Sequence, residues 1–354
     1  MSEAAIGQSI TVRCLLDPHW HGREGEVTGP IIEHSYWGGA RLLGAMPNTE
    51  DGNRDAQTVM LYNARMWTST PVAKRIHFID YVQINEHTTQ QTIDTCVAAG
   101  IREGKVYPKG RTTAAHHGVS DYYLLLPIVA YAGARGMRIH FHPEHPSEQV
   151  DSRDAEYLFI PIVDMFMRAT NATIVWEHGT DARCIPHWVE WAKTGRFFIT
   201  FTGHHLLGNE SNTYGDTAAA CKPPYRTEMD RQGISWLIRR NFAWVMAGTD
   251  SAIHPIEAKH RVGQCACGAF TGPFALQLYA HALIDLLATP WGIDTFNNFV
   301  HENACRFYGL GTGRFPDLKL AVQDFQIPLT YDVGPWKGVV PFWAGRKLAV
   351  TLVS

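Results

Sequence analysis

SITVRCLLDPHWHGR, residues 9–23, is a run of β-branched and aliphatic residues that ends in two histidines separated by one tryptophan. Its first part, Ser9 to Leu16, predicts a buried β-strand. Because alternate residues of a strand share a face, His19 and His21 can point at one metal ion. The pair alone is weak evidence, since 18 histidines among 354 residues give about one such pair by chance, and His140-Phe141-His142 is a second instance. The alternative is ordinary surface or hydrogen-bonded histidines.

Similar runs recur along the chain and alternate with stretches of helical periodicity at residues 121–134, 155–169 and 186–193. This alternation is typical of βα units around a parallel sheet, and eight units predict an α/β fold, a closed (β/α)8 TIM barrel. No Pro-, Gly- or Ser-rich linker divides the chain, so we expect one barrel domain over residues 1–354, with residues 310–354 as a small C-terminal extension packed on it. The expected strands are Ser9 to Leu16, Arg41 to Met46, Arg75 to Val82, Gly100 to Tyr107, Met137 to His142, Thr173 to Glu177, Phe197 to Thr202 and Ala243 to Gly248.

Composition favours a globular protein that acts on a small molecule. The chain is 45% hydrophobic and 18% charged, and its formal net charge is −3 without a long run of one sign, which indicates neither a nucleic-acid nor a membrane surface. The N-terminus lacks the basic and apolar regions of a secretory signal, so we expect a cytoplasmic protein. Seven scattered cysteines then predict reduced thiols. Cys265 and Cys267 form the one close pair, which could bind metal but is expected to consist of loop or packing residues.

Four further chemically active side chains fall at the ends of expected strands. Lys105 ends the fourth strand, His142 the fifth, His178 follows the sixth and Asp250 the eighth. TIM-barrel active sites lie at the carboxyl ends of the strands, where these side chains would meet the first histidine pair. Asp250 alone could cap a helix, and His178 alone could be a hydrogen-bonded core residue. Their joint occurrence at one rim favours a metal centre.

The types and number of these residues suggest two zinc ions. Imidazole and carboxylate groups suit Zn²⁺, and four histidines with one aspartate exceed the ligands of a single catalytic zinc. Two ions need a bridge, which Lys105 would supply after reaction with carbon dioxide, because a carbamate has two oxygens. The alternative for Lys105 is a solvated side chain that extends its ammonium group to the surface.

The order of the motifs resembles that of the dihydroorotases of the amidohydrolase superfamily, in particular the short bacterial type. The resemblance covers nearly the whole chain and implies a TIM barrel of the amidohydrolase type. It rests on His19-x-His21-x-Arg23, Met46-Pro47-Asn48, Gly104-Lys105-Val106-Tyr107-Pro108, Thr112-Thr113, His117-Gly118-Val119, His142, Glu177-His178, Gly248-Thr249-Asp250-Ser251 with His254, and Val340-Pro341-Phe342-Trp343-Ala344-Gly345.

The resemblance implies two Zn²⁺ ions per chain, bridged by N6-carboxylated Lys105. Asp250 would be both a zinc ligand and the general acid and base. The implied ligands are His19, His21 and Asp250 for one ion and His142 and His178 for the other, with Lys105 between them.

The resemblance also implies a substrate site. Arg23, Asn48 and His254 would hold the substrate carboxylate. Thr112 and Thr113 resemble the family's mobile loop, which closes over the substrate and excludes water from the reacting centre. The alternative for this loop is a plain surface turn.

The chain departs from the family pattern in its first motif and in the spacing of one later segment. Pro18 and Gly22 stand where relatives commonly carry bulkier residues, and residues 252–270 are spaced differently. The different spacing leaves open which backbone groups of Cys267-Gly268 contact the substrate ring. Lys222-Pro223 occupies a segment that contributes backbone contacts in relatives.

The expected activity is the reversible cyclisation of N-carbamoyl-L-aspartate to L-dihydroorotate in de novo pyrimidine biosynthesis. In the hydrolytic direction, a metal-bridging hydroxide would attack the ring amide carbonyl, and Asp250 would carry the proton to the departing ring nitrogen. Two alternatives remain open. One is another binuclear cyclic amidase, of the hydantoinase or dihydropyrimidinase type, which has no need for Arg23; the other is a catalytically silent homologue with an assembly role. Relatives are commonly dimers, so a homodimer is expected.

Overall fold

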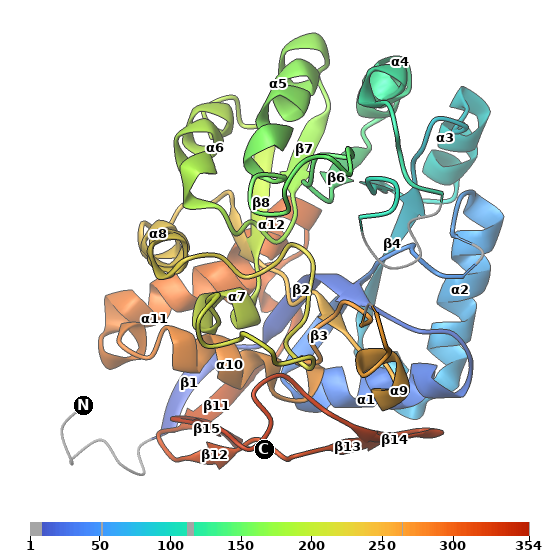
Figure 1. The fold of residues 1–354 in the computed structure, drawn as a ribbon. Coiled ribbons are helices and arrows are strands. Elements are labelled where there is room, and N and C mark those ends of the chain that lie inside the picture. Colours follow the sequence, from blue (N-terminus) through green and yellow to red (C-terminus); the bar gives the residue numbers. More distant parts are fainter. Residues whose placement is uncertain (1–8, 51, 112–116, 264, 354) are drawn as a thin grey trace.

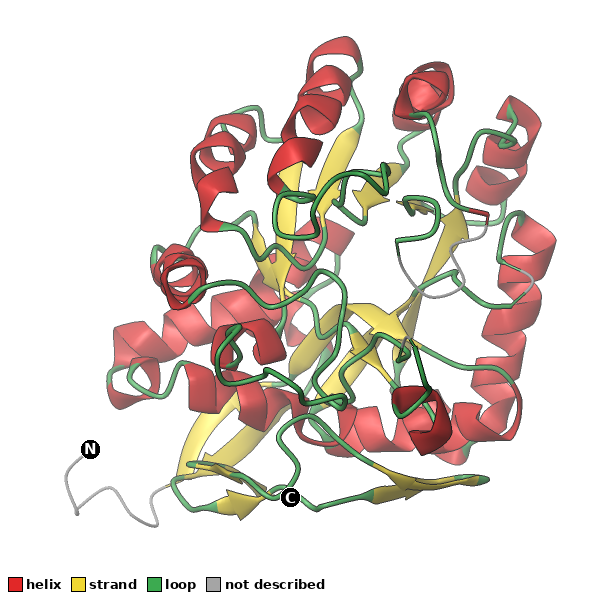
Figure 2. Ribbon diagram, in the orientation of Figure 1, coloured by secondary structure: helices red, strands yellow, loops and turns green. Residues whose placement is uncertain are grey.

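The structure is a computed structural model that describes residues 9–50, 52–111, 117–263 and 265–353. A nine-stranded parallel sheet occupies its centre, in the order β10-β2-β3-β4-β5-β6-β7-β8-β9, and helices lie outside it (Figure 1). Figure 2 shows the same strands in yellow within a ring of red helices. The strands are β2 (Leu15–His21), β3 (Ala40–Ala45), β4 (His77–Gln83), β5 (Glu103–Val106), β6 (Arg138–Phe141), β7 (Thr173–Trp176), β8 (Phe197–Phe201), β9 (Val245–Ala247) and β10 (Ser251–Ala252).

The sheet closes on itself because its last two strands are neighbouring parts of one chain segment. β9 pairs with β8, and β10, which begins four residues after β9 ends, pairs with β2 through Ser251 and Ala252. The backbone N–H of Asp250 also donates to the carbonyl oxygen of His19 at 2.8 Å. These two strands therefore fill the eighth position of the expected barrel, and the TIM-barrel prediction is confirmed.

The helices follow the strands in the order that βα units require. In α5 the buried residues Ile160, Val163, Phe166 and Met167 fall on one helical face, and Phe166 stacks on Phe141 of β6 at 5.2 Å between ring centroids. The helices are α1 (Thr28–Trp37), α2 (Ala56–Ser69), α3 (Gln90–Ala98), α4 (Leu126–Ala134), α5 (Ile160–Ala169), α6 (Ile185–Ala192), α7 (Gly203–Leu207), α8 (Glu228–Arg239), α9 (Ile256–Lys259), α10 (Ala275–Ala282), α11 (Pro290–Asn297) and α12 (Asn303–Tyr308).

One expected strand is wrong in its bounds. The run Ser9 to Leu16 is divided between β1 (Ser9–Arg13) and the start of β2, because β1 leaves the barrel and pairs antiparallel with β11. Cys14 lies between the two strands. Sequence alone could not locate this break, because the apolar pattern continues through it.

The C-terminal part of the chain forms small antiparallel sheets beside the barrel, which lie along the lower edge of Figure 1. β1, β11 and β16 make one sheet, and two pairs of short strands make the others. The strands are β11 (Asp317–Ala321), β12 (Phe325–Gln326), β13 (Tyr331–Val333), β14 (Trp336–Val339), β15 (Lys347–Leu348) and β16 (Thr351–Val353). Among the described residues, no helix is long and apolar enough to cross a membrane.

Candidate active site

Three of the expected metal ligands converge at the end of β2. The donor atoms of His19, His21 and Asp250 all lie within 4.8 Å of one another. An Asp250 carboxylate oxygen is 2.8 Å from Nε2 of His21 and 3.3 Å from Nε2 of His19. Burial acts to raise the pKa of Asp250, but its hydrogen bonds with the two histidines hold that pKa well below its usual value. Asp250 is therefore an ionised carboxylate against two imidazoles.

Asp250 and His178 both have backbone conformations that are uncommon for residues other than glycine. Their φ angles are 47° and 40°, in the left-handed region, where each such residue costs about 1 to 3 kcal/mol. Buried Asp17 compensates part of this cost, because its carboxylate accepts hydrogen bonds from the Thr249 N–H at 2.8 Å and the Thr249 hydroxyl at 2.6 Å. The strained residues thus turn their side chains into the barrel mouth.

The other expected ligands lie on the far side of the same cluster. The ring of His178 is 4.9 Å from that of His19 and 4.6 Å from that of His142, between centroids. Lys105 is fully buried, and among the described residues its Nζ has no hydrogen-bond partner. Burial lowers the pKa of Lys105 to about 8. All six expected ligands are thus brought together at the carboxyl ends of the strands, as TIM-barrel active sites require.

These residues fit a pair of divalent metal ions. Within the described residues, Nδ1 of His178 and Nζ of Lys105 are both buried without a partner, although buried polar groups are normally satisfied. Burial first, and then the neighbouring His142, hold the pKa of His178 well below its usual value, so its ring is neutral. Neutral imidazole is the form that binds metal, and the low pKa of Lys105 favours the neutral amine that reacts with carbon dioxide.

A buried network, whose role was not predicted from the sequence, supports the cluster from inside the barrel. Glu177 lies 2.8 Å from Nδ1 of His19 and 2.6 Å from Nδ1 of His140, and it accepts a 2.5 Å hydrogen bond from Thr200. Glu103 contacts Nε2 of His140 at 2.9 Å. His140 is therefore part of this support and not a member of the ligand cluster.

The second His-x-His pair of the sequence, His140 and His142, is divided between this network and the ligand cluster. His140 lies in β6 and His142 directly follows its last residue, Phe141, so the two histidines, two positions apart, face the same side of the sheet. His142 has a carboxylate partner of its own, Glu144, 2.7 Å from its Nε2. Glu144 and Glu177 each hold an imidazole of the cluster.

The expected substrate residues lie next to the cluster. Nδ1 of His21 is 2.8 Å from the side-chain oxygen of Asn48. The Arg23 guanidinium donates to the carbonyl oxygens of Ile253 and Gly22, each at 3.0 Å, and lies 3.3 Å from Nε2 of His254. These backbone contacts fix the plane of the guanidinium at the pocket.

One pocket joins Arg23 and Asn48 to the ligand cluster. Thr112 and Thr113 lie outside the described residues, so the expected loop is not placed. The lining residues are His19, His21, Arg23, Asn48, Tyr107, His142, Lys222, Asp250, Ala252, Cys267 and Gly268.

Comparisons with known proteins show which sequences and folds the chain is similar to. No family model matches the chain. The dihydroorotase of Neisseria meningitidis serogroup C is 26% identical, over 98% of this chain and 99% of that protein. The dihydroorotase structure from Saccharomyces cerevisiae has a TM-score of 0.90 and 22% identity, over 98% of each chain. L-hydantoinase from Arthrobacter aurescens has a TM-score of 0.81 and 13% identity, over 98% of this chain and 83% of that one.

The chain is a relative of the dihydroorotases. Its barrel is the one that dihydroorotases share with hydantoinases, so the fold does not separate the two cyclic amidases. The residues that line the pocket therefore bear more directly than the fold on the choice between these two activities. Lys222, for which only backbone contacts were expected, lines the pocket of this dihydroorotase relative with Arg23.

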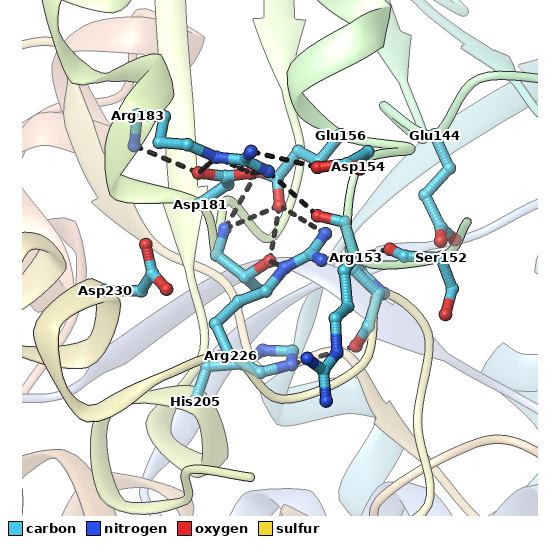
Figure 3. Close-up of polar contacts among 12 residues, drawn as sticks. Glu144, Ser152, Arg153, Asp154, Glu156, Asp181, Arg183, His205, Arg226 and Asp230 are labelled. Atoms are coloured by element: carbon cyan, nitrogen blue, oxygen red, sulfur yellow. Dashed lines mark hydrogen bonds and ion pairs between the residues drawn. The ribbon is translucent and has the colours of Figure 1, made fainter. Parts of the chain in front are cut away.

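A network of hydrogen bonds and ion pairs around Arg226 and Arg183 borders a second pocket of the molecule. Arg226 donates to the Thr180 hydroxyl at 3.1 Å and to the Ser152 carbonyl at 2.9 Å, and lies 3.6 Å from Glu156 (Figure 3). Arg183 pairs with both Asp181 and Asp154 in the same view. These contacts join the loops after β6, β7 and β8 to one another.

Proposed function

We propose that the protein catalyses the reversible cyclisation of N-carbamoyl-L-aspartate to L-dihydroorotate in de novo pyrimidine biosynthesis. The observation that carries the proposal is the position of Arg23, whose anchored guanidinium lines the same pocket as the His19, His21 and Asp250 cluster. A planar guanidinium can make two charge-assisted hydrogen bonds to a carboxylate, a group that dihydroorotate has and that dihydrouracil lacks. The likeness to dihydroorotases supports the same substrate.

Two Zn²⁺ ions would be held by the side chains that the structure brings together. His19, His21 and Asp250 would hold one ion, His142 and His178 the other, and N6-carboxylated Lys105 would link the two. When bound, such a pair supplies a nucleophile at neutral pH and polarises the amide carbonyl.

Asp250 is the proposed proton carrier of the reaction. In the hydrolytic direction it takes the proton of the nucleophile and delivers it to the ring nitrogen that leaves. In the direction of cyclisation the same carboxylate takes the proton from the carbamoyl nitrogen. Its contacts with His19 and His21 keep it ionised and oriented before the reaction starts.

Arg23, Asn48 and His254 orient the substrate in this proposal. Burial, followed by the charge of Arg23, lowers the pKa of His254 to about 3, so the imidazole is neutral beside the guanidinium. Its Nε2 is 2.9 Å from the carbonyl oxygen of Cys267. Arg23 therefore supplies the positive charge at this end of the pocket, beside a neutral His254 whose Nε2–H donates to the Cys267 carbonyl oxygen. We further propose that Thr112 and Thr113 close over the bound substrate.

A turnover assay with dihydroorotate and dihydrouracil separates the proposal from its alternatives. We expect turnover of dihydroorotate and little of dihydrouracil. Equal turnover of both would replace the proposal with a hydantoinase or dihydropyrimidinase type of activity. Turnover of neither by metal-loaded protein would identify a catalytically silent homologue with an assembly role.

We also propose a cytoplasmic homodimer in which residues 1–354 form one amidohydrolase domain and residues 310–354 its extension. The pairing of β1 with β11 supports the domain assignment, because it fastens the C-terminal segment to the start of the barrel. Sedimentation equilibrium of the purified protein would test the dimer.

A further inference from the structure

A second cluster of metal-binding side chains lies apart from the six residues discussed above. It consists of His204 and His205, both on α7 (Gly203–Leu207), and Cys221. One donor atom from each of the three lies within 4.8 Å of the other two, and all three residues are buried. The set combines two imidazoles with a thiol, which suits Zn²⁺.

His204 is the observation that points to a ligand in this cluster. The residue is 0% exposed, and neither of its ring nitrogens has a hydrogen-bond partner among the described residues. A buried imidazole with two unpaired nitrogens is unusual in a folded protein and needs an explanation. Burial holds the pKa of His204 well below its usual value, so the ring is neutral and one nitrogen keeps a lone pair.

The spacing of His205 and Cys221 matches a tetrahedral ion. Nε2 of His205 lies 3.4 Å from Sγ of Cys221. Zinc at about 2.1 Å from nitrogen and 2.3 Å from sulfur separates two tetrahedral ligands by about 3.6 Å. The two atoms therefore need almost no movement to share one ion.

The other nitrogen of His205 is already held in the way that metal ligands usually are. Nδ1 lies 2.8 Å from the hydroxyl of Thr202, which also caps α7 by accepting from the His205 backbone N–H. With Nδ1 donating to that hydroxyl, Nε2 is free to bind an ion. Without an ion, Nε2 carries the proton and donates to the carbonyl oxygen of Pro223 at 3.0 Å.

We propose that His204, His205 and Cys221 form an additional divalent metal site, of the imidazole and thiolate type that Zn²⁺ occupies, separate from the binuclear centre. Binding replaces the thiol proton of Cys221 with a sulfur–metal bond and releases that proton to solvent. Three protein ligands leave a fourth position for a water molecule. The site links α7 to the segment that carries Lys222 into the pocket wall.

Lys259 also holds the segment that contains Cys221 in a fixed position. Nζ of Lys259 donates to the carbonyl oxygens of Ala220, Ala266 and Gly268 at 2.8 to 3.0 Å. The lysine thus joins the residue before Cys221 to the segment of Ala266 and Gly268, and Gly268 lines the pocket. A metal ion at Cys221 would hold the same segment on its α7 side.

Cobalt substitution tests the proposal without reference to activity. Thiolate bound to Co²⁺ gives a near-ultraviolet charge-transfer band, and none of the six residues assigned to the binuclear centre is a cysteine. We expect the Co²⁺-loaded full chain to show this band at three ions per chain and Cys221→Ser to lose the band while keeping two ions. Cys305→Ser is the matched control, because Cys305 belongs to a different cluster with His301 and Glu302, and it should retain the band.

Absence of the band in the cobalt-loaded wild type, or its persistence in Cys221→Ser, would overturn the proposal. Should Cys221→Ser fail to fold, X-ray absorption of the zinc-loaded wild type gives the answer directly. We expect a zinc–sulfur distance of about 2.3 Å, and spectra with only nitrogen and oxygen ligands would overturn the site. Either measurement leaves the proposed dihydroorotase activity untouched.

Discussion

Arg23 is the residue on which we expect substrate choice to depend. Its contacts with Gly22 and Ile253 hold the guanidinium at the pocket without using all five of its N–H groups. Loss of a charge-assisted carboxylate pair in a closed site costs about 2 to 5 kcal/mol. We therefore expect Arg23→Gln to lose at least about a hundredfold in kcat/KM for dihydroorotate in a turnover assay. The metal content and the thermal unfolding temperature of the variant should equal those of the wild type.

The matched control for this substitution is Arg65→Gln. Arg65 is also near an acid, Glu24 at 3.1 Å, but its side chain is 65% exposed. An exposed pair contributes less than about 1 kcal/mol, so this variant should retain full kcat/KM. A wild-type level of dihydroorotate turnover in Arg23→Gln would show that the carboxylate is held elsewhere.

The lowered pKa of Lys105 predicts that the carboxylation of this residue depends on pH. Carbon dioxide reacts with the neutral amine, and burial lowers the pKa of Lys105 from 10.5 to about 8. The neutral fraction therefore rises about tenfold per pH unit below pH 8 and levels off above it. We expect the initial rate of carbamate formation in metal-free protein, followed by ¹³C NMR at constant dissolved ¹³CO₂, to follow this curve. A rate that keeps rising to pH 10 would show an ordinary, solvated lysine.

The sequence was sufficient to predict which side chains meet at the mouth of the barrel but not the residues that support them. His19 and Asp250 follow strands and belong to types that bind zinc, so barrel geometry alone brings them together. Glu177 and Asp17 act through hydrogen bonds to residues distant in sequence, and nothing in their own neighbourhoods indicates these partners. The pairing of His204 with Cys221 depends on a loop path that local patterns do not specify.

At the scale of elements, Glu177 connects the ends of several barrel strands. It follows β7 and reaches His19 on β2, His140 on β6 and Thr200 on β8. Supporting carboxylates of this kind typically contribute 10- to 100-fold, roughly, to metal affinity. We expect Glu177→Gln to weaken metal binding by about that factor, measured by competition with a chelator, while the fold is retained.

Glu103→Gln is the control from the same buried network. Glu103 contacts His140 and Arg138 but none of the proposed ligands. It should therefore lower the free energy of unfolding and leave metal affinity unchanged. Equal losses of affinity in both variants would mean that the network acts through general stability and not through the orientation of His19.

The observed strands lie within a few residues of the predicted ones wherever a predicted run belongs to a single sheet. The exception is the run from Ser9 to Leu16, where a continuous apolar pattern serves two sheets. β1 pairs with β11, which lies about three hundred residues later, so only a long-range contact determines the break. Local periodicity contains no information on such a partner.

At the scale of the whole molecule, one end of the barrel holds the pocket and the other end contributes to the stability of the fold. The carboxyl ends of the strands hold the pocket, while Arg13, just before β2 at the opposite end, joins three segments. Its Nε lies 3.0 Å from Glu302 and its Nη1 2.6 Å from Asp317 of β11, and its backbone N–H donates to Asn297 at 2.8 Å. Arg13 should therefore stabilise the fold without influence on catalysis.

We expect Arg13→Met to lower the free energy of unfolding by about 1 to 3 kcal/mol, because hydrogen bonds between charged partners in a half-buried setting are lost while the side-chain volume is nearly kept. Urea unfolding measures this change. Arg168→Met, at an i,i+4 surface pair with Asp164 whose arginine is 80% exposed, should cost under about 0.5 kcal/mol. Both variants should keep the wild-type kcat/KM at 25 °C, since neither residue reaches the pocket. A fall in kcat/KM for Arg13→Met, with the folded population unchanged, would mean that the base of the barrel controls the spacing of the strands at its mouth.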